Sequence, residues 1–552
     1  MADPKDAKKE TSDLRAISVA EFFEKNRHLL GFDNPIRALL TSVKEAVDNS
    51  LDACESGKIL PDIFVQIQKI SDTRFKMIVE DNGPGIPKQY VAGAFGKLLY
   101  GSKFRSFGGK QSRGQQGIGI SAAVLYGQLT AGKPARVISK TTKDKQANVL
   151  EIKINVQTNE PEIVSQTLID WKKEHGTRVE VEMEAKYMEK KASVIEYIKE
   201  TAIVNPHASI TYVDPEGQKS TFKRVSDDLP REPEEIKPHP HGIELGSLLR
   251  MLKETSARAL NSFLITEFDK VGTGTAEEML KIAGLDPKIG PKFITIEQAD
   301  KLIKAMHGAK VMSPTTSCLV PITAELLMKA LQEEYTLEFV HAVTRTPSVY
   351  RGSPFLIEVA VGYGGEKGEL PADQTVKLFR FANRVPLLYQ QGACALTKSV
   401  TAVDWKNYGL QQSGDNMPVG PAIIIVHIAS VWAPFTSESK EAIAHYDEII
   451  KEAKLALQEV GRALQLYVGK KQKKQMAEMK ADMFKLYGIE LAEALSSLTG
   501  AKKETIQKDL DKLTSEMLKL GAIEEAEAKE SEEDKAKPKR KLGAFKGDDK
   551  DE

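Results

Sequence analysis

The stretch SRGQQGIGISAA, residues 112–123, places Gly114, Gly117 and Gly119 directly before an alternating small and apolar run that predicts a helix. Glycine costs about 1 kcal/mol relative to alanine in a helix, so three glycines at a helix entrance need another reason. Unhindered backbone N–H groups and the partial positive charge of a helix N-terminus both favour a phosphate group. The stretch therefore predicts an anion cradle.

A second segment, GQLTAGKP from Gly127 to Pro134, also resembles a phosphate-binding loop, because it matches the first seven positions of a Walker A motif. Pro134 stands where that motif requires the Ser or Thr that binds Mg²⁺. We therefore reject this segment as a phosphate site and keep the glycines after residue 112.

Upstream of the glycines, the segment EAVDNSLDA carries Glu45, Asn49 and Asp52 at positions i, i+4 and i+7. A helix would place these two carboxylates and the amide on one face. The apolar positions of the same helix form a separate stripe: Leu40, Val43, Val47 and Leu51. Taken alone, a solvated helix face explains the polar residues better than a site does.

The segment IVEDNGPGI ends a predicted strand at Asp81 and then turns on glycine and proline, with Gly85 in the turn. Such a turn lets the backbone pass close to a ligand while the carboxylate stays at the strand end. In HGTRVEVEM, Thr177 stands at the start of a further strand, where its hydroxyl could support Asp81. By themselves, an ordinary turn and a plain strand start fit these segments as well.

The elements that must position these residues form a recognisable order. A helix is predicted for residues 34–54, and strand-like runs follow at 63–70, 75–81, 135–141, 148–156, 177–183 and 208–214. Helices followed by largely antiparallel strands indicate an α+β sandwich of about 220 residues.

A proline- and charge-rich segment, DLPREPEEIKPHPHG, marks a boundary near residue 230. Residues 245–310 predict a helical insert; strand patterns return at 337–345, 355–364, 376–388 and 421–432, and a long helix is predicted from Lys440 to Val468. We expect a multidomain α+β chain with four parts: residues 1–230, 231–310, 311–470 and a helical, charged tail at 471–552. The stretch from about Glu524 is low in apolar residues and is expected to be disordered.

The overall composition excludes several classes of protein. The 78 basic and 78 acidic residues give no net charge, so overall charge favours neither a polyanion nor a membrane surface as partner. The three cysteines lack metal-binding spacing, which argues against a zinc site or a disulfide scaffold and favours a reducing interior. The N-terminus lacks the apolar core of a secretory signal, and the longest apolar run, residues 422–433, is too short to span a bilayer.

In this order, the helix, the turn, the glycine stretch and the later strand resemble the GHKL ATPase superfamily, which includes gyrase, Hsp90, MutL and sensor histidine kinases. A finer resemblance, over about residues 15–470, is to the B subunits of the archaeal-type topoisomerase VI family. It is carried by EAVDNSLDACE, DNGPGIP, GSKF, SRGQQGIGISAAVLY, HGTRVEVEME, RFANRVPLLY and APFTSESKEAIA. It implies a GHKL (Bergerat) ATPase sandwich, a helix-two-turns-helix insert, and a ribosomal-S5-like transducer domain with a long C-terminal helix.

The resemblance also implies roles for individual residues, with ATP and Mg²⁺ as the bound groups. Glu45 matches the general base that activates the attacking water, Asn49 matches the Mg²⁺ ligand, and Lys440 matches a lysine that reaches the γ-phosphate. Asp81 would accept a hydrogen bond from the adenine amino group, and Gly85 would let the ring approach. The other expected contacts are Ser102, Lys103, Gln111, Ser112, Arg113, Gly114, Gln115, Gln116, Gly117, Ile118, Gly119 and Thr177.

For partners, the resemblance implies a DNA-cleaving A subunit, double-stranded DNA and an A₂B₂ heterotetramer without a membrane, in the cytoplasm at the nucleoid of an archaeal-type cell. ATP would close two copies into a dimer, and one duplex would pass through a break made by the A subunit, which relaxes and decatenates DNA. This sequence has no tyrosine in a recognisable nuclease setting, so cleavage is expected in the partner.

Basic residues outside the ATP site give weaker signals. The turn GLDPKIGPKF offers Lys288 and Lys292 to DNA phosphates, and ordinary surface lysines fit equally well. The run KKQKK at residues 470–474 fits a solvated helix surface better than a contact with DNA or a partner.

Two other functions share the same pocket. A chaperone or mismatch-repair scaffold would lack the helical insert, and a sensor kinase would place the pocket after a phosphoacceptor helix. Stimulation of the ATPase by DNA only when a cleavage subunit is present would distinguish the topoisomerase from both.

Overall fold

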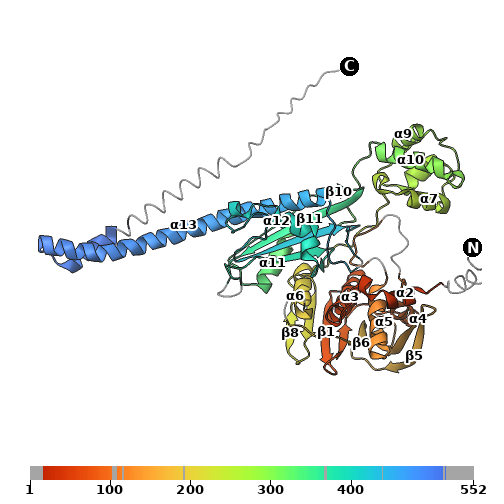
Figure 1. Ribbon diagram of the computed structural model, residues 1–552, viewed down its shortest axis with the longest axis horizontal. Helices are drawn as coiled ribbons and strands as arrows, with labels where there is room; N and C mark the ends of the chain where they lie inside the picture. The colour runs from red at the N-terminus through yellow and green to blue at the C-terminus, as the bar shows by residue number, and fades with distance from the viewer. Residues whose placement is uncertain are drawn as a thin grey trace, which may run out of the picture. The chain divides into compact units, whose positions relative to one another are not determined.

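The computed structural model describes residues 16–101, 109–114, 117–189, 193–365, 370–437, 439–513 and 516. The chain divides into two compact units, Met1–Leu464 and Gln465–Glu552. The first unit contains two β-sheets and a group of helices between them in sequence, which Figure 1 colours from red through green to blue.

The first sheet has eight strands in the order β5-β4-β3-β6-β2-β1-β7-β8. All neighbouring strands are antiparallel except β1 and β7, which are parallel. The strands are β1 Asp62–Lys69, β2 Arg74–Glu80, β3 Ala135–Lys140, β4 Ala147–Asn155, β5 Glu160–Ile169, β6 Gly176–Glu184, β7 Ser209–Val213 and β8 Lys219–Phe222. The predicted strands are confirmed. Edge strands β5 and β8 were missed, because neither has a buried residue and neither carries a regular apolar alternation.

Helices cover this sheet, and α3 and α5 pack against each other and against β2 and β6 (Figure 1). The helices are α2 Val19–Lys25, α3 Pro35–Ser56, α4 Lys88–Gly96, α5 Gly119–Ala131 and α6 Val194–Val204. The side chain of Asn34 caps α3 by accepting hydrogen bonds from the N–H groups of Ile36 and Arg37. The predicted apolar stripe of α3 is confirmed, because all four of its side chains are buried in the core: Leu40, Val43, Val47 and Leu51.

The predicted helical segment after residue 245 is also confirmed. It contains α7 Leu245–Glu254, α8 Leu260–Glu267, α9 Thr273–Ala283 and α10 Ile296–Gly308, with the short 3₁₀ turn η3 Pro291–Phe293 before α10. These helices share a hydrophobic core of their own, in which Phe263, Leu280 and Leu302 are fully buried.

The second sheet has the order β10-β11-β14-β12-β13, and β9 pairs with the same edge of β11 as β10 does. Its strands are β9 Phe339–Thr344, β10 Ser348–Tyr350, β11 Ser353–Tyr363, β12 Lys377–Ala382, β13 Val385–Pro386 and β14 Ala422–Ser430. Helices α11 Ala324–Glu334 and α12 Ala395–Thr401 belong to the same region. The long apolar run is therefore the buried central strand β14, as its length indicated.

The long helix α13 spans Asp447–Thr499, so the predicted bounds Lys440 and Val468 were both wrong. Lys440 cannot start the helix because its backbone is left-handed, with φ of 52°. The chain there folds back on itself: Phe435 pairs with Ile443, and Ala444 N–H donates to the carbonyl of Pro434. None of the described helices combines the length and the apolar composition that a membrane crossing requires.

Candidate active site

A cavity of about 320 Å³ lies among α3, α4, α5 and the segments that follow β13 and β14. Seven of the predicted site residues line it: Glu45, Asn49, Gly114, Gly117, Ile118, Gly119 and Lys440. The remaining wall is largely apolar and includes Phe32, Phe95, Ile120 and Leu388. The structure therefore brings the polar face of α3, the glycines and a lysine from a distant part of the chain to one cavity.

The side chain of Glu45 lies directly against the backbone of Gly119. A Cβ placed on Gly119 would lie 1.8 Å from Oε2 of Glu45. The carboxylate thus rests against the first residue of α5, where the partial positive charge of the helix favours an anion. The glycine at this position is required by the carboxylate itself.

Asp81 is buried and is fixed by three donors. Its Oδ1 accepts hydrogen bonds from the N–H groups of Gly83 at 2.9 Å and Thr177 at 3.0 Å, and its Oδ2 accepts one from the Ser50 hydroxyl at 3.1 Å. Burial raises the pKa of Asp81. Thr177 supports Asp81 through its backbone N–H, whereas the sequence pointed to its hydroxyl.

Gly85 has a φ of 73°, and a Cβ there would lie 2.1 Å from the carbonyl oxygen of Lys140. Close packing against β3 therefore requires a glycine at this position. Asp81, Gly85 and Thr177 lie outside the lining of the cavity, although Ser50, which holds Asp81, follows Asn49 directly in α3.

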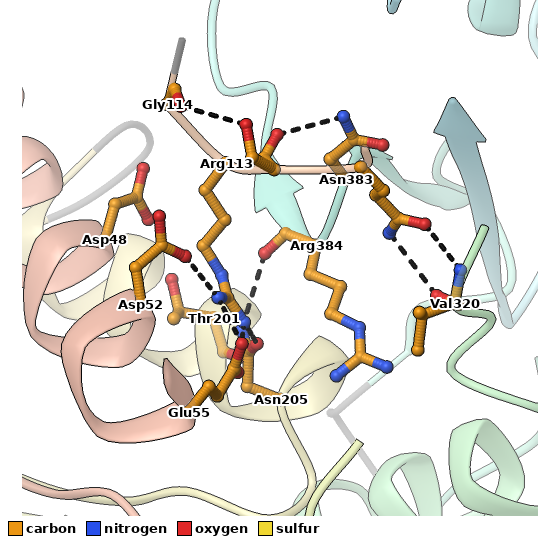
Figure 2. Close-up of polar contacts among 12 residues, drawn as sticks. Asp48, Asp52, Glu55, Arg113, Gly114, Thr201, Asn205, Val320, Asn383 and Arg384 are labelled. Atoms are coloured by element: carbon orange, nitrogen blue, oxygen red, sulfur yellow. Dashed lines mark hydrogen bonds and ion pairs between the residues drawn. The ribbon is translucent and has the colours of Figure 1, made fainter. Parts of the chain in front are cut away.

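Residues 109–114, which lead into the glycines, are held by the second sheet and its flanking segments. The Gln111 side chain donates to the carbonyl of Val320 at 3.3 Å and accepts from the Val320 N–H at 2.7 Å (Figure 2). The carbonyl of Ser112 accepts a hydrogen bond from the Asn383 side chain at 3.0 Å. The side chain of Gln111 is therefore engaged by the protein and not by the cavity.

Arg113 connects the same segment to α3. Its guanidinium contacts Asp52 at 2.7 Å, both oxygens of Glu55 at 2.8 and 2.6 Å, and Asn205 at 2.6 Å (Figure 2). Burial opposes the charged form of Arg113, but the carboxylates of Glu55 and Asp52 outweigh it and raise the pKa. Burial likewise opposes the charged form of Glu55, whose pKa is nevertheless lowered by Arg113 and His207. Asp52 therefore serves an ion pair, not the cavity.

Lys440 reaches this segment from the loop after β14, and its Nζ donates to the carbonyl of Arg113 at 3.1 Å. Its neighbour Glu441 forms an ion pair with Arg37 of α3 and accepts a hydrogen bond from Gln390 at 2.7 Å. These contacts attach the lysine loop to the helix that carries Glu45.

Four predicted contacts, Ser102, Lys103, Gln115 and Gln116, lie outside the described residues. Sequence patterns did not point to Arg37, Asn383, Arg384 and Glu441, although the last three stand inside motifs that carried the resemblance. Several of their contacts pair residues that are far apart in the chain, with 271 positions between Ser112 and Asn383 and 404 between Arg37 and Glu441. No local spacing could have revealed them.

Two known protein families match parts of this chain. Residues 38–186 match the family described as histidine kinase-, DNA gyrase B- and HSP90-like ATPase, and residues 314–480 match the topoisomerase VI B subunit transducer family. The chain is 53% identical to the B subunit of type 2 DNA topoisomerase 6 from Methanococcoides burtonii, over 83% of this chain and 73% of that protein. The same protein of Archaeoglobus fulgidus is 53% identical over 83% and 75%, and that of Natronomonas pharaonis is 34% identical over 93% and 86%.

Proposed function

We propose, from the premise that this chain belongs to the family of type 2 DNA topoisomerase 6 B subunits, that its cavity is the site where ATP is hydrolysed with Glu45 as general base. The chain is a subunit of an ATP-dependent type IIB topoisomerase, it binds ATP through its GHKL ATPase domain, and it acts with an A subunit on DNA. The observation that carries the assignment is the convergence of Glu45, Asn49 and the α5 glycines on one cavity.

Glu45 can act as the base because its carboxylate lines the cavity beside the start of α5, where backbone N–H groups favour phosphate oxygens. A carboxylate in this place can take the proton of a water that attacks the terminal phosphorus. A positioned base of this kind contributes about 10²- to 10⁴-fold to the rate.

Asn49 is exposed on the cavity wall one helical turn from Glu45, and its amide oxygen fits a hard cation. Mg²⁺ in nucleotide sites takes few protein oxygens together with phosphate oxygens, so a single amide ligand is compatible with it. When bound, Mg²⁺ would neutralise phosphate charge. Asp81, held by Ser50, Gly83 and Thr177, is rigid enough to orient an adenine amino group.

Lys440 is placed to respond to ATP, because its ammonium rests on the carbonyl of Arg113, one residue before Gly114 of the cavity wall. If Lys440 released that carbonyl and bound the γ-phosphate of ATP instead, the loop after β14 would shift. ATP would also close two copies of the chain into a dimer within an A₂B₂ heterotetramer, so that one duplex passes through the break made by the A subunit. Such a complex would work at the nucleoid.

We assign the four expected parts of the chain to four domains. They are an ATPase domain at 1–230, a helix-two-turns-helix domain at 231–310, a transducer domain at 311–470 and a C-terminal tail at 471–552. Two observations support this division: the sheets are separate, and the helices between them have their own core. In the helical insert, Lys292 lies in η3 and Lys288 lies three residues before η3, and both are the candidates for DNA phosphate contacts.

The test is Glu45→Ala in the complex with the A subunit. Nucleotide binding should persist, while the ATPase rate should fall about 10²-fold or more because the base is missing. Glu174→Ala is the control, because Glu174 is an exposed carboxylate outside the cavity lining. An ATPase rate of Glu45→Ala within a few fold of the unaltered chain would exclude Glu45 as the base.

A further inference from the structure

The turn between β12 and β13 consists of Asn383 and Arg384, and both residues are left-handed, with φ of 49° and 65°. A two-residue hairpin turn of this kind favours asparagine at its first position. The backbone therefore explains why an asparagine stands there. It does not explain the contacts that the buried amide makes.

The amide of Asn383 joins two segments that are not otherwise part of its hairpin. Its Nδ2 donates to the carbonyl of Ser430 at 2.9 Å and to the carbonyl of Ser112 at 3.0 Å, and its Oδ1 accepts from the Ser430 N–H at 2.9 Å. Ser430 is the last residue of β14. One side chain thus ties the end of the central strand of the second sheet to the segment that enters the ATP site.

The contact with Ser112 does not stand alone. Lys440 donates to the carbonyl of Arg113, the next residue, and the loop that carries Lys440 begins directly after Ser430. Two side chains from one end of the second sheet therefore hold consecutive carbonyl groups of the same segment. A displacement of residues 112–114 must change both contacts or move the end of β14.

The other side of this segment is fixed to the ATPase domain. The Arg113 guanidinium is almost fully buried against Asp52 and Glu55 of α3, so the segment cannot slide freely along the helix. Gly114, which follows Arg113, lines the cavity, so the segment that Asn383 and Lys440 hold leads directly into the cavity wall.

We propose that Asn383 is a positioning residue that transmits the state of the ATP site to the second sheet through Ser112 and Ser430. When a triphosphate binds in the cavity beside Gly114, the Ser112 carbonyl moves, and the Asn383 amide passes this movement to the end of β14 and the loop that carries Lys440. Asn383 lies outside the lining of the cavity, so it would act on the ATP site through Ser112. The inference rests on the proposed ATP site and specifies how that site controls the transducer domain.

A purely structural role of Asn383 would depend on fewer contacts than a coupling role. Stability of the hairpin requires the left-handed backbone and the two bonds to Ser430, whereas coupling requires the bond to Ser112 as well. A residue that only stabilises the turn would, when replaced, lower stability and all activities together. Replacement of a coupling residue would lower DNA relaxation relative to ATP hydrolysis.

The test is Asn383→Asp in the reconstituted complex with the A subunit. The change keeps the size of the side chain and its tolerance of a left-handed backbone, but it directs a carboxylate oxygen at the carbonyls of Ser112 and Ser430. The number of DNA relaxation events per ATP hydrolysed should fall about tenfold, and the Kd for a non-hydrolysable ATP analogue should change less than about threefold. Asn383→Gly, which preserves the turn and deletes the amide, provides the same measurement if the first variant does not fold.

Asn159→Asp is the matched control. Asn159 is also a left-handed turn residue, with φ of 57°, and its amide holds the N–H and the carbonyl of Leu98, both at 3.0 Å. These contacts lie within the first sheet and its helices, so the variant should lose stability without losing coupling. A fall in relaxation per ATP confined to the Asn383 variants supports the proposal.

An unchanged ratio in both Asn383 variants, or an equal fall in Asn159→Asp, overturns it. These outcomes are separate from failure of the ATP site, because they are read in proteins that still hydrolyse ATP. The assignment of Glu45 as general base is tested separately by the ATPase rate of Glu45→Ala, which does not depend on DNA relaxation.

Discussion

Two halves of one glycine-containing stretch are held in opposite ways. Residues 109–114 are fixed by side chains: Gln111 binds Val320, and Arg113 binds Asp52 and Glu55. Residues 117–119 present mainly backbone to the cavity, and Gly119 faces the carboxylate of Glu45. The first half joins the two sheets of the chain, and the second half leaves space for a ligand.

Within the motif from which the sequence predicts an anion cradle, Gly114, Gly117, Ile118 and Gly119 line the cavity, so only this part is open to the predicted anion. Asp52 and Glu55 compensate the buried charge of Arg113, so this side chain attaches the first half firmly to α3. In the second half, Gly117 and Gly119 carry no side chains, so bound phosphates can approach their backbone N–H groups directly. Substitutions in the first half should therefore affect stability, and those in the second half should affect catalysis.

The largest effect is expected for Arg113→Met. The change leaves Asp52 and Glu55 without their buried partner and should lower the free energy of unfolding by about 3 to 5 kcal/mol. Urea denaturation measures this loss of unfolding free energy. Arg178→Met is the control, because Arg178 pairs with Glu80 and Glu180 at a more exposed site and should lose only about 1 kcal/mol. Equal losses in the two variants would show that the Arg113 cluster is no stronger than a surface pair.

Gly119→Ala tests the glycine half. The new methyl group must displace the flexible end of the Glu45 side chain, so the fold should survive while the base leaves its place. The ATPase kcat should fall about 10²-fold, with the midpoint of thermal unfolding little changed. Gly274→Ala is the control, because a Cβ near the start of α9 meets open space. Normal turnover in Gly119→Ala would mean that Glu45 does not need its present position.

The sequence predicted the glycine half better than the fixed half, and the reason is physical. Helical spacing on α3 and glycines before α5 are local patterns, and the family resemblance selected Glu45, Asn49 and Gly119 from them. Arg113 depends on carboxylates 58 and 61 residues away. Such pairs arise only when the chain folds, and a charged residue in a glycine-rich motif was read as a phosphate ligand instead.

The same limit explains the errors in the second sheet region. Apolar and charged residues after Lys440 continue a helical pattern, but contacts of this loop with Pro434, Phe435 and Cys394 prevent a helix before Asp447. By contrast, β14 was recognised because a fully buried strand leaves a continuous apolar run in the sequence.

Gln111→Ala removes both side-chain bonds to the Val320 backbone and should cost about 2 kcal/mol. Hydrogen exchange at the Val320 amide should accelerate, because its N–H loses its acceptor. Gln128→Ala is the control: Gln128 makes the same two bonds to Ile154, at 2.9 and 2.7 Å, within the first sheet and its helices. Acceleration at Val320 in Gln128→Ala as well would show that the Gln111 contact is not an independent attachment.

The smallest effect concerns Asp48, which lies on α3 one turn before Asp52 but lacks the guanidinium partner. Its Oδ1 accepts a hydrogen bond from the Tyr197 hydroxyl, and its Oδ2 has no partner among the described residues. Burial raises the pKa of Asp48 to about 6, against the attraction of Lys44. The folded state therefore binds a proton more tightly than the unfolded state does.

Because the pKa is higher in the folded state, stability from this group is present at low pH and is lost as pH rises from about 4 to 6. Asp48→Asn removes the titration, so the unaltered chain should lose about 1.4 kcal/mol relative to the variant between pH 5 and pH 8. Urea denaturation at both pH values measures this difference, with the exposed Asp228→Asn as control. A difference that does not change with pH would mean that Asp48 is as well compensated as Glu55, and that the charge compensation around Arg113 extends along the whole polar face of α3.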